Sequence, residues 1–127
     1  MPDTAPKPPK LHREFFTIDF AGEWTPVPGY PNGIAYQTLA DDFDEAAGRG
    51  SRTRLVEFKP GVLLDRRVVH EFWEEVYVVS GDLVVIDPET RAETSYGQHT
   101  YACRPPGTPH GPFSSRTGCL LLELHHF

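Results

Sequence analysis

Two histidines and one glutamate have the types and spacing to bind a metal ion. His70 and Glu74 lie at the start of an aromatic, β-branched run, and His110 follows a turn rich in proline and glycine. Two imidazoles and one carboxylate suit a divalent metal. The sequence therefore predicts a metal site made of His70, Glu74 and His110, with Glu74 and His110 as the catalytic residues.

The run from residue 72 to 79 must position the first two of these ligands. Its composition favours a β-strand. Side chains alternate between the faces of a strand, so Glu74 shares the face of His70 and Glu75 lies on the other. On a flat strand, residues four apart are separated by about 13 Å. We therefore expect a bulge or a strong twist near Trp73 to bring both side chains onto one ion.

The turn at residues 103–111 must position the third ligand. Three prolines and two glycines make this segment tight and rigid. Such a turn presents His110 at a defined angle. Position 74 is a glutamate rather than a second histidine, and the surrounding residues favour a strand, so a helical His-Glu-x-x-His protease site is excluded.

The remaining histidines and the arginines have no such support. The other histidines stand outside any motif, and the pair beside the C-terminus is expected on the surface: His12, His99, His125 and His126. Four arginines are candidates for holding an anionic substrate, although each is interpreted first as a surface charge: Arg54, Arg66, Arg67 and Arg104.

The two stretches together resemble the two motifs of the cupin superfamily. The first motif is matched by His70, three residues, Glu74, six residues and Gly81. The second ends in Pro-x-Gly-x-x-His, which is matched by residues 105–110. The resemblance covers residues 53–124 and is nearest to small cupins related to the sensor domain of zinc-dependent anti-sigma factors. It implies an all-β fold, the double-stranded β-helix or jelly-roll cupin barrel.

Three positions depart from the cupin pattern. Val68 stands where the first motif histidine is expected, so the usual set of three histidines and one glutamate loses a ligand. Seven residues, not five, separate Gly97 from Pro105, and Ser114 replaces a common asparagine. Because Val68 cannot bind a metal, a further interpretation is a protein that binds its ligand in a pocket without a metal ion.

The resemblance implies a small metal-dependent enzyme. The first interpretation is a non-haem dioxygenase-type oxidoreductase that acts on a small carbonyl or diketone-like compound. Fe(II) is then the preferred metal, with Zn, Mn or Ni as alternatives. A zinc-dependent lyase, isomerase or cyclase, and a non-catalytic ligand or metal sensor, remain as other interpretations. Small cupins commonly pair through sheet edges, so a homodimer is expected.

Composition narrows the partners and the location. The chain of 127 residues has a net charge of −6 and a pI of about 5.4, which argues against nucleic acid and anionic membranes. It has no apolar run of membrane-spanning length and no signal-peptide pattern. Two cysteines do not make a disulfide framework, so a cytoplasmic location is expected.

The domain organisation is expected to be simple. Residues 1–12 are rich in proline and predict a flexible arm, and residues 13–127 predict a single cupin domain. Turn residues recur every six to twelve positions, which indicates about ten short strands. The first strand is expected at residues 13–20, and one helical turn at residues 40–47.

Overall fold

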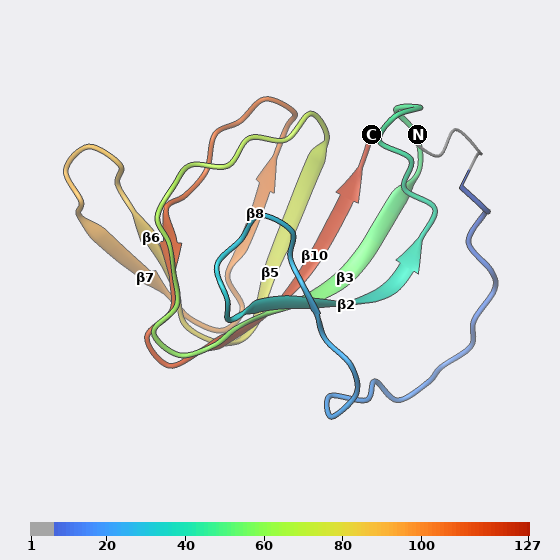
Figure 1. Ribbon diagram of the computed structural model, residues 1–127, viewed down its shortest axis with the longest axis horizontal. Helices are drawn as coiled ribbons and strands as arrows, with labels where there is room; N and C mark the ends of the chain where they lie inside the picture. Colours follow the sequence, from blue (N-terminus) through green and yellow to red (C-terminus); the bar gives the residue numbers. More distant parts are fainter. Residues whose placement is uncertain (1–6) are drawn as a thin grey trace.

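The computed structural model describes residues 7–127, which form two antiparallel β-sheets (Figure 1). The larger sheet has the order β1-β2-β3-β10-β5-β8, with bounds Thr25–Pro26, Ile34–Asp41, Ser51–Phe58, Cys119–His126, Trp73–Gly81 and Tyr101–Arg104. The smaller sheet has the order β4-β9-β6-β7, with bounds Leu63–Leu64, Phe113–Ser114, Leu83–Ile86 and Glu93–Tyr96. The described part of the chain contains no helix, and the predicted all-β jelly-roll fold is confirmed.

Strand β10 lies at the centre of the larger sheet, between β3 and β5. Its burial alternates, with every second residue from Cys119 to His125 buried. This period of two is expected where one face of a strand packs on a core. The inward residues of both sheets form one apolar core, which includes Ile34, Val56, Phe58, Leu64, Val68, Val76, Val78, Leu83, Phe113 and Leu121. The same inward face of β10 also carries Glu123 and His125.

Two local predictions are wrong. Residues 13–20 are not a strand: they run outside the body of the protein without a pairing partner (Figure 1). Residues 40–47 are not helical; the end of β2 and a turn occupy them, closed by an isolated bridge between Asp44 and Arg49. Pairing explains both outcomes: residues 13–20 have no partner strand in the described chain, whereas residues 40–41 pair with β3 as the end of β2.

The proline-rich arm is described only in part. Residues 1–6 lie outside the described residues, and residues 7–12 are extended and exposed. The prediction of a flexible arm at residues 1–12, followed by one domain at residues 13–127, stays a prediction. Across residues 7–127, no helix has the length and apolar character needed to span a bilayer.

Candidate metal centre

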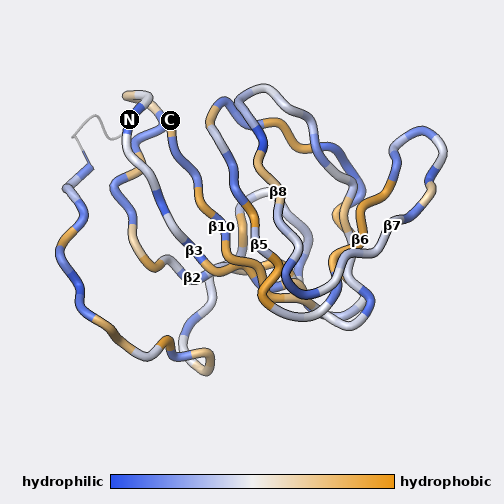
Figure 2. Tube along the Cα trace, turned by 180° about the vertical axis from the view of Figure 1, so that it is seen from behind, coloured by the Kyte–Doolittle hydropathy of each residue, from blue (hydrophilic) through white to orange (hydrophobic). Residues whose placement is uncertain are grey.

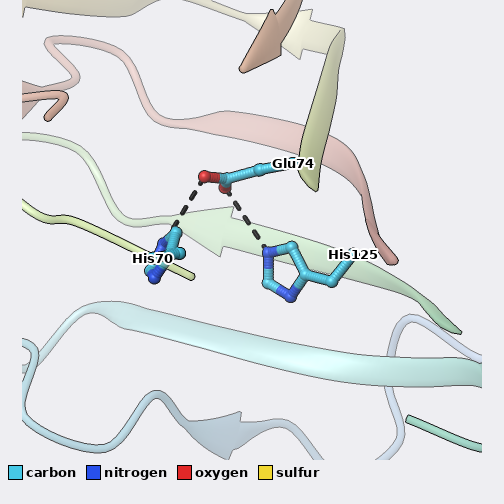
Figure 3. Close-up of side chains that lie close together, drawn as sticks. All are labelled: His70, Glu74 and His125. Carbon is cyan, nitrogen blue, oxygen red and sulfur yellow. Dashed lines mark ion pairs between the residues drawn. The ribbon is translucent and has the colours of Figure 1, made fainter. Parts of the chain in front are cut away.

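Glu74 is the centre of a cluster of histidines on the inward face of the larger sheet. It is the second residue of β5 and is only 5% exposed. His110 Nε2 lies 3.0 Å and His70 Nε2 lies 3.4 Å from Glu74 Oε2. His125 Nε2 lies 3.5 Å from the other oxygen, Oε1, and Figure 3 shows the carboxylate between His70 and His125. All three predicted ligands, together with one unexpected histidine, therefore surround one carboxylate.

His70 reaches this cluster from a loop rather than from the strand. Strand β5 begins at Trp73, so His70 lies before it, and the distance expected along a flat strand does not apply. No bulge near Trp73 is needed, and that expectation is wrong. The imidazole stacks on the Phe72 ring, with centroids 4.7 Å apart and planes within 8°.

His110 is held by backbone pairing between the two motif segments. Val68 N donates to His110 O at 2.7 Å, and His110 N donates to Val68 O at 2.9 Å. Gly107 N donates to His70 O at 2.7 Å from a backbone with φ of 80°, a conformation that glycine adopts without strain. Val68 replaces a ligand in the motif, but its side chain is part of the buried core and its backbone positions His110.

His125 was expected on the surface, and this prediction is wrong. Its side chain is 1% exposed, because it occupies an inward position of β10 directly opposite Glu74 on β5. The signal was present in the alternation of residues 119–125, in which Leu121 and Glu123 share its face. His126 points to the opposite face and is partly exposed, while His12 and His99, which belong to no motif, are exposed.

The donor atoms have the spacing of a metal-binding cluster. Atoms of His70, Glu74 and His125 lie within 4.8 Å of one another, so these residues form a candidate metal-binding triad. Metal–ligand distances of about 2.0–2.2 Å place neighbouring ligands about 3.0–3.5 Å apart. The separations around Glu74 fall in this range. Glu74 Oε2 is buried and has no hydrogen-bond partner in the described structure, as expected for an atom that a cation would satisfy.

Hydrogen bonds give His110 and His125 different tautomers. His110 Nδ1 lies 3.0 Å from Thr108 O, a carbonyl that can only accept, so the Nε2 lone pair is directed to Glu74. His125 Nδ1 instead accepts a bond of 2.8 Å from Arg52 Nε, which leaves the proton of the neutral ring on Nε2. His110 is therefore ready to bind a metal. His125 would first have to lose the bond from Arg52.

The electrostatics of the cluster favour a neutral His70 beside a charged Glu74. Burial lowers the pKa of His70 to about 4, against the pull of Glu74 in the other direction. Burial alone would raise the pKa of Glu74, but the adjacent His110 and His125 outweigh it and hold that pKa well below its usual range. A neutral imidazole beside an ionised carboxylate is the protonation state that metal ligation requires.

A small, mostly apolar cavity adjoins the cluster and has a few polar groups in its wall. Its volume is about 40 Å³, and its wall includes Glu74, His110, Tyr30 and Arg104. Arg54 and Glu123 on the same wall form a buried ion pair. Burial raises the pKa of Tyr30 to about 12, so its phenol stays protonated and can donate a hydrogen bond.

Comparison with solved structures finds the same architecture in proteins of low sequence identity. An acetylacetone dioxygenase from Acinetobacter johnsonii superposes with a TM-score of 0.66 at 17% identity, over 91% of this chain and 75% of that one. An RmlC-like cupin from Shewanella frigidimarina gives 0.63 at 20%, over 90% and 91%. The polyketide cyclase RemF from Streptomyces resistomycificus gives 0.67 at 22%, over 89% and 80%.

The chain has the cupin fold. The resemblance inferred from the two motifs is confirmed at this level. No family model matches the sequence, and neither does any curated protein sequence. The cupin fold carries different activities in the similar structures, so the function must be argued from the centre at Glu74.

Proposed function

We propose that this cupin is a metal-dependent enzyme of the non-haem dioxygenase type, acting on a small carbonyl or diketone-like compound. The observation that carries the proposal is the buried, unpartnered Oε2 of Glu74 with imidazole nitrogens at 3.0 and 3.4 Å. A carboxylate in this state needs a cation. Two histidines and one carboxylate are the facial set of non-haem Fe(II) oxygenases.

The ligands that we propose are His70, Glu74 and His110. The tautomer of His110 supports its place in the set, and the backbone bonds to Val68 hold it there. We assign His125 a positioning role, because its proton-bearing Nε2 faces Glu74 Oε1 and Glu123 Oε1 at 3.5 and 3.1 Å. It fixes the carboxylate from the side opposite to the metal ligands.

A divalent ion at this site supplies Lewis acidity and, if it is iron, one-electron redox chemistry. The protein residues do the rest. Glu74 brings the negative charge, and Phe72 stacks on His70 and restrains its ring. The apolar wall of Val76, Leu83 and Leu121 excludes bulk water from the cavity beside the cluster.

The substrate class is supported by two facts. The cavity is small, and it presents a neutral phenol and a guanidinium that can donate to carbonyl oxygens. One similar structure is an acetylacetone dioxygenase by name, and acetylacetone is a diketone. We also propose a cytoplasmic location, which two free cysteines, Cys103 and Cys119, support.

The test combines metal loading with oxygen uptake. Metal-free protein is loaded separately with Fe(II), Zn, Mn and Ni, and a panel of small diketones and other carbonyl compounds is assayed with an oxygen electrode. We expect one ion per chain and oxygen uptake with Fe(II) that disappears in Glu74→Gln. Tight iron binding without oxygen uptake on any compound would reject the dioxygenase.

A zinc-dependent cyclase or lyase is the second candidate. It is favoured by the fourth nitrogen, because His125 would complete a set of three histidines and one glutamate if Arg52 released it. The structure of the polyketide cyclase RemF is also similar. Product formation with zinc-loaded protein in the absence of oxygen would select this alternative.

A further inference from the structure

Arg104 has hydrogen-bonding capacity that the rest of the site does not use. It ends β8 and lies directly opposite Glu74 on β5. Its side chain is 19% exposed, and the nearest acidic atom, Glu74 Oε2, is 3.9 Å from Nη1. Across residues 7–127, no hydrogen bond from its guanidinium is present, so a mostly buried cation has several free donors.

Arg104 also lies where three cavities meet. It lines the inner cavity of about 40 Å³ together with Glu74 and His110. It lines a surface cleft of about 450 Å³, whose wall also includes His110 and Phe113. A second cleft, of about 300 Å³, reaches it along β8. Arg104 therefore lies on the boundary between the inner cavity and both surface clefts.

The other arginines near the centre are already engaged. Arg54 pairs with Glu123, and Arg52 donates to His125. Arg104 is held from one side by the Phe113 ring, 5.7 Å from its Cζ. A guanidinium has a planar fork of donors that fits a carboxylate or the two oxygens of an enolate. Arg104 therefore has the geometry of an unused anion receptor.

We propose that Arg104 is the residue that selects the substrate, and that the substrate is a small carbonyl compound with a negative charge. The anion enters through the surface cleft and places its carboxylate or enolate oxygens on Arg104. Its carbonyl group then lies beside Glu74 and His110. This inference rests on the proposed function for the role of the metal, but the anion site itself does not need the metal.

The test therefore uses metal-free protein. Pyruvate, its neutral methyl ester and acetylacetone are titrated separately into chelator-treated wild type, Arg104→Gln and the control Arg91→Gln, with amide chemical shifts as the readout. Arg91 is a surface residue paired with Asp65, and it does not line the cleft that contains Arg104. We expect Arg104→Gln to weaken pyruvate binding about tenfold or more, with little effect on the ester. Acetylacetone binding that depends on Arg104 identifies an enolate, and pyruvate binding alone identifies a carboxylate.

Three results would overturn the proposal. The first is that neither pyruvate nor acetylacetone binds to wild type, and the second is that the ligand that binds does so equally well to Arg104→Gln. The third is that pyruvate and its ester both bind, with equal affinity. If Arg104→Gln does not fold, Arg104→Lys keeps the charge without the fork and should bind pyruvate more weakly than wild type. Metal affinity is measured in parallel. If the protein binds no metal but still binds the anion through Arg104, the proposed metal-dependent function fails and the anion site stands.

A second inference concerns the N-terminal segment, defined here as residues 7–24. It stands away from both sheets, and hydrophobic stretches run along it (Figures 1 and 2). Leu11 is 87% exposed and Phe15 is fully exposed, while Phe16 and Phe20 are about half exposed. The segment is anchored near its start by Lys7 to Asp41 and by Lys10 to Ser51 and Asp42, and further along by the bond from Gln37 to Asp19 O. Between Lys10 and Asp19, no hydrogen bond to either sheet is present in the described structure.

The segment faces an incompletely paired sheet edge. Strand β2 pairs with β3 along most of its length but with β1 only at Ala35 and Tyr36. A cleft of about 510 Å³ separates the remainder of this edge from the segment, and Phe16, Tyr36 and Leu39 are among the residues that line it. An unpaired strand edge beside an apolar, extended chain favours addition of another strand.

We infer that the N-terminal segment of a second copy fills this cleft, and reciprocally. The two segments would then lie side by side between the two β2 strands, which joins the larger sheets across a two-fold axis. With roughly 200 Å² per phenylalanine, the exposed parts of Phe15, Phe16 and Phe20 amount to roughly 400 Å² per chain. Two segments and their receiving surfaces then bury roughly 1,600 Å², the usual size of a stable interface.

Light scattering after size exclusion tests this arrangement. We expect a dimer for wild type, a monomer for Phe15→Asp, and a dimer for the control Tyr101→Asp, which places a charge at the β8 edge instead. A monomeric wild type, or a dimer that is broken only by Tyr101→Asp, would overturn the inference. Since Phe15 is fully exposed within one chain, Phe15→Asp should still fold, which a cooperative thermal unfolding transition would check.

Discussion

Strands β5 and β10 carry two glutamate–histidine pairs, one on each face of the same sheet. The inner pair is Glu74 and His125, and the outer pair is Glu75 and His126. The outer pair is bonded at 3.1 Å, and Tyr101 donates to the same glutamate at 2.5 Å. The inner pair is nearly fully buried, and one atom of each of its residues, Glu74 Oε2 and His125 Nε2, lacks a hydrogen-bond partner.

The difference shows why the inner cluster is the candidate metal site and the outer one is an ordinary polar cluster. The hydrogen bond from Tyr101 lowers the pKa of Glu75, and the carboxylate is complete without a metal. Glu74 has comparable neighbours at comparable distances, but burial denies it water, and its Oε2 has no hydrogen-bond partner in the described structure. Burial together with a missing partner, rather than proximity alone, identifies the centre.

The largest effect on metal affinity should come from substituting Glu74, with the same substitution of Glu75 as the comparison. Glu74→Gln removes the charge that holds the ion, so we expect metal affinity to fall more than about 100-fold, beyond the usual cost of an outer-shell change. Glu75→Gln is the matched control on the opposite face and should bind metal like wild type. Dialysis against a weak chelator followed by elemental analysis measures both. Equal loss in the two variants would remove the distinction between the faces.

Removal of His110 should have the next largest effect. Two remaining ligands rarely retain a divalent ion, so His110→Ala is expected to lose the metal under the same dialysis. His99→Ala, at an exposed position, serves as the control. If His110→Ala retained the ion while His125→Ala lost it, the ligand set would have to be rewritten as His70, Glu74 and His125.

The free energy of unfolding should depend on pH because His70 is partly buried beside Glu74. The folded-state pKa of His70 is about 4, below the unfolded value of about 6.5. Between these values the unfolded chain binds more protons, so the stability of the metal-free protein falls as the pH drops. We expect up to about 3 kcal/mol from this side chain. Urea unfolding from pH 7 to 4 measures the slope, which should flatten in His70→Gln.

The smallest effect should separate His125 from His126. If His125 only positions Glu74, His125→Ala should lower metal affinity about tenfold, which is the scale of an outer-shell change. His126→Ala should cost nothing. A loss for His125→Ala as large as that for His110→Ala would make it a ligand, and an absent effect would leave it with a purely structural role.

The sequence alone predicted the architecture and most of the centre. The motif spacing around His70, Glu74 and His110 sufficed because local patterns encode turns and strands. His125 was missed because its role depends on pairing with β5, across residues far apart in sequence. The same holds for Arg104, one arginine among four until strand register placed it opposite Glu74.

The strand predicted at residues 13–20 failed for a related reason. Its alternation is compatible with a strand, but a strand needs a partner, and within the described chain no strand lies beside it. Its apolar residues remain exposed instead. In the proposed dimer, the N-terminal segment of a second copy would supply the missing partner.

Anomalous diffraction from metal-loaded crystals, collected at the absorption edge of the bound metal, tests the central claim most directly. We predict one peak per chain within bonding distance of Glu74 Oε2 and of Nε2 of both His70 and His110, with His125 still bonded to Arg52. A peak elsewhere, or none beside Glu74 in protein shown by elemental analysis to contain the metal, would contradict the account.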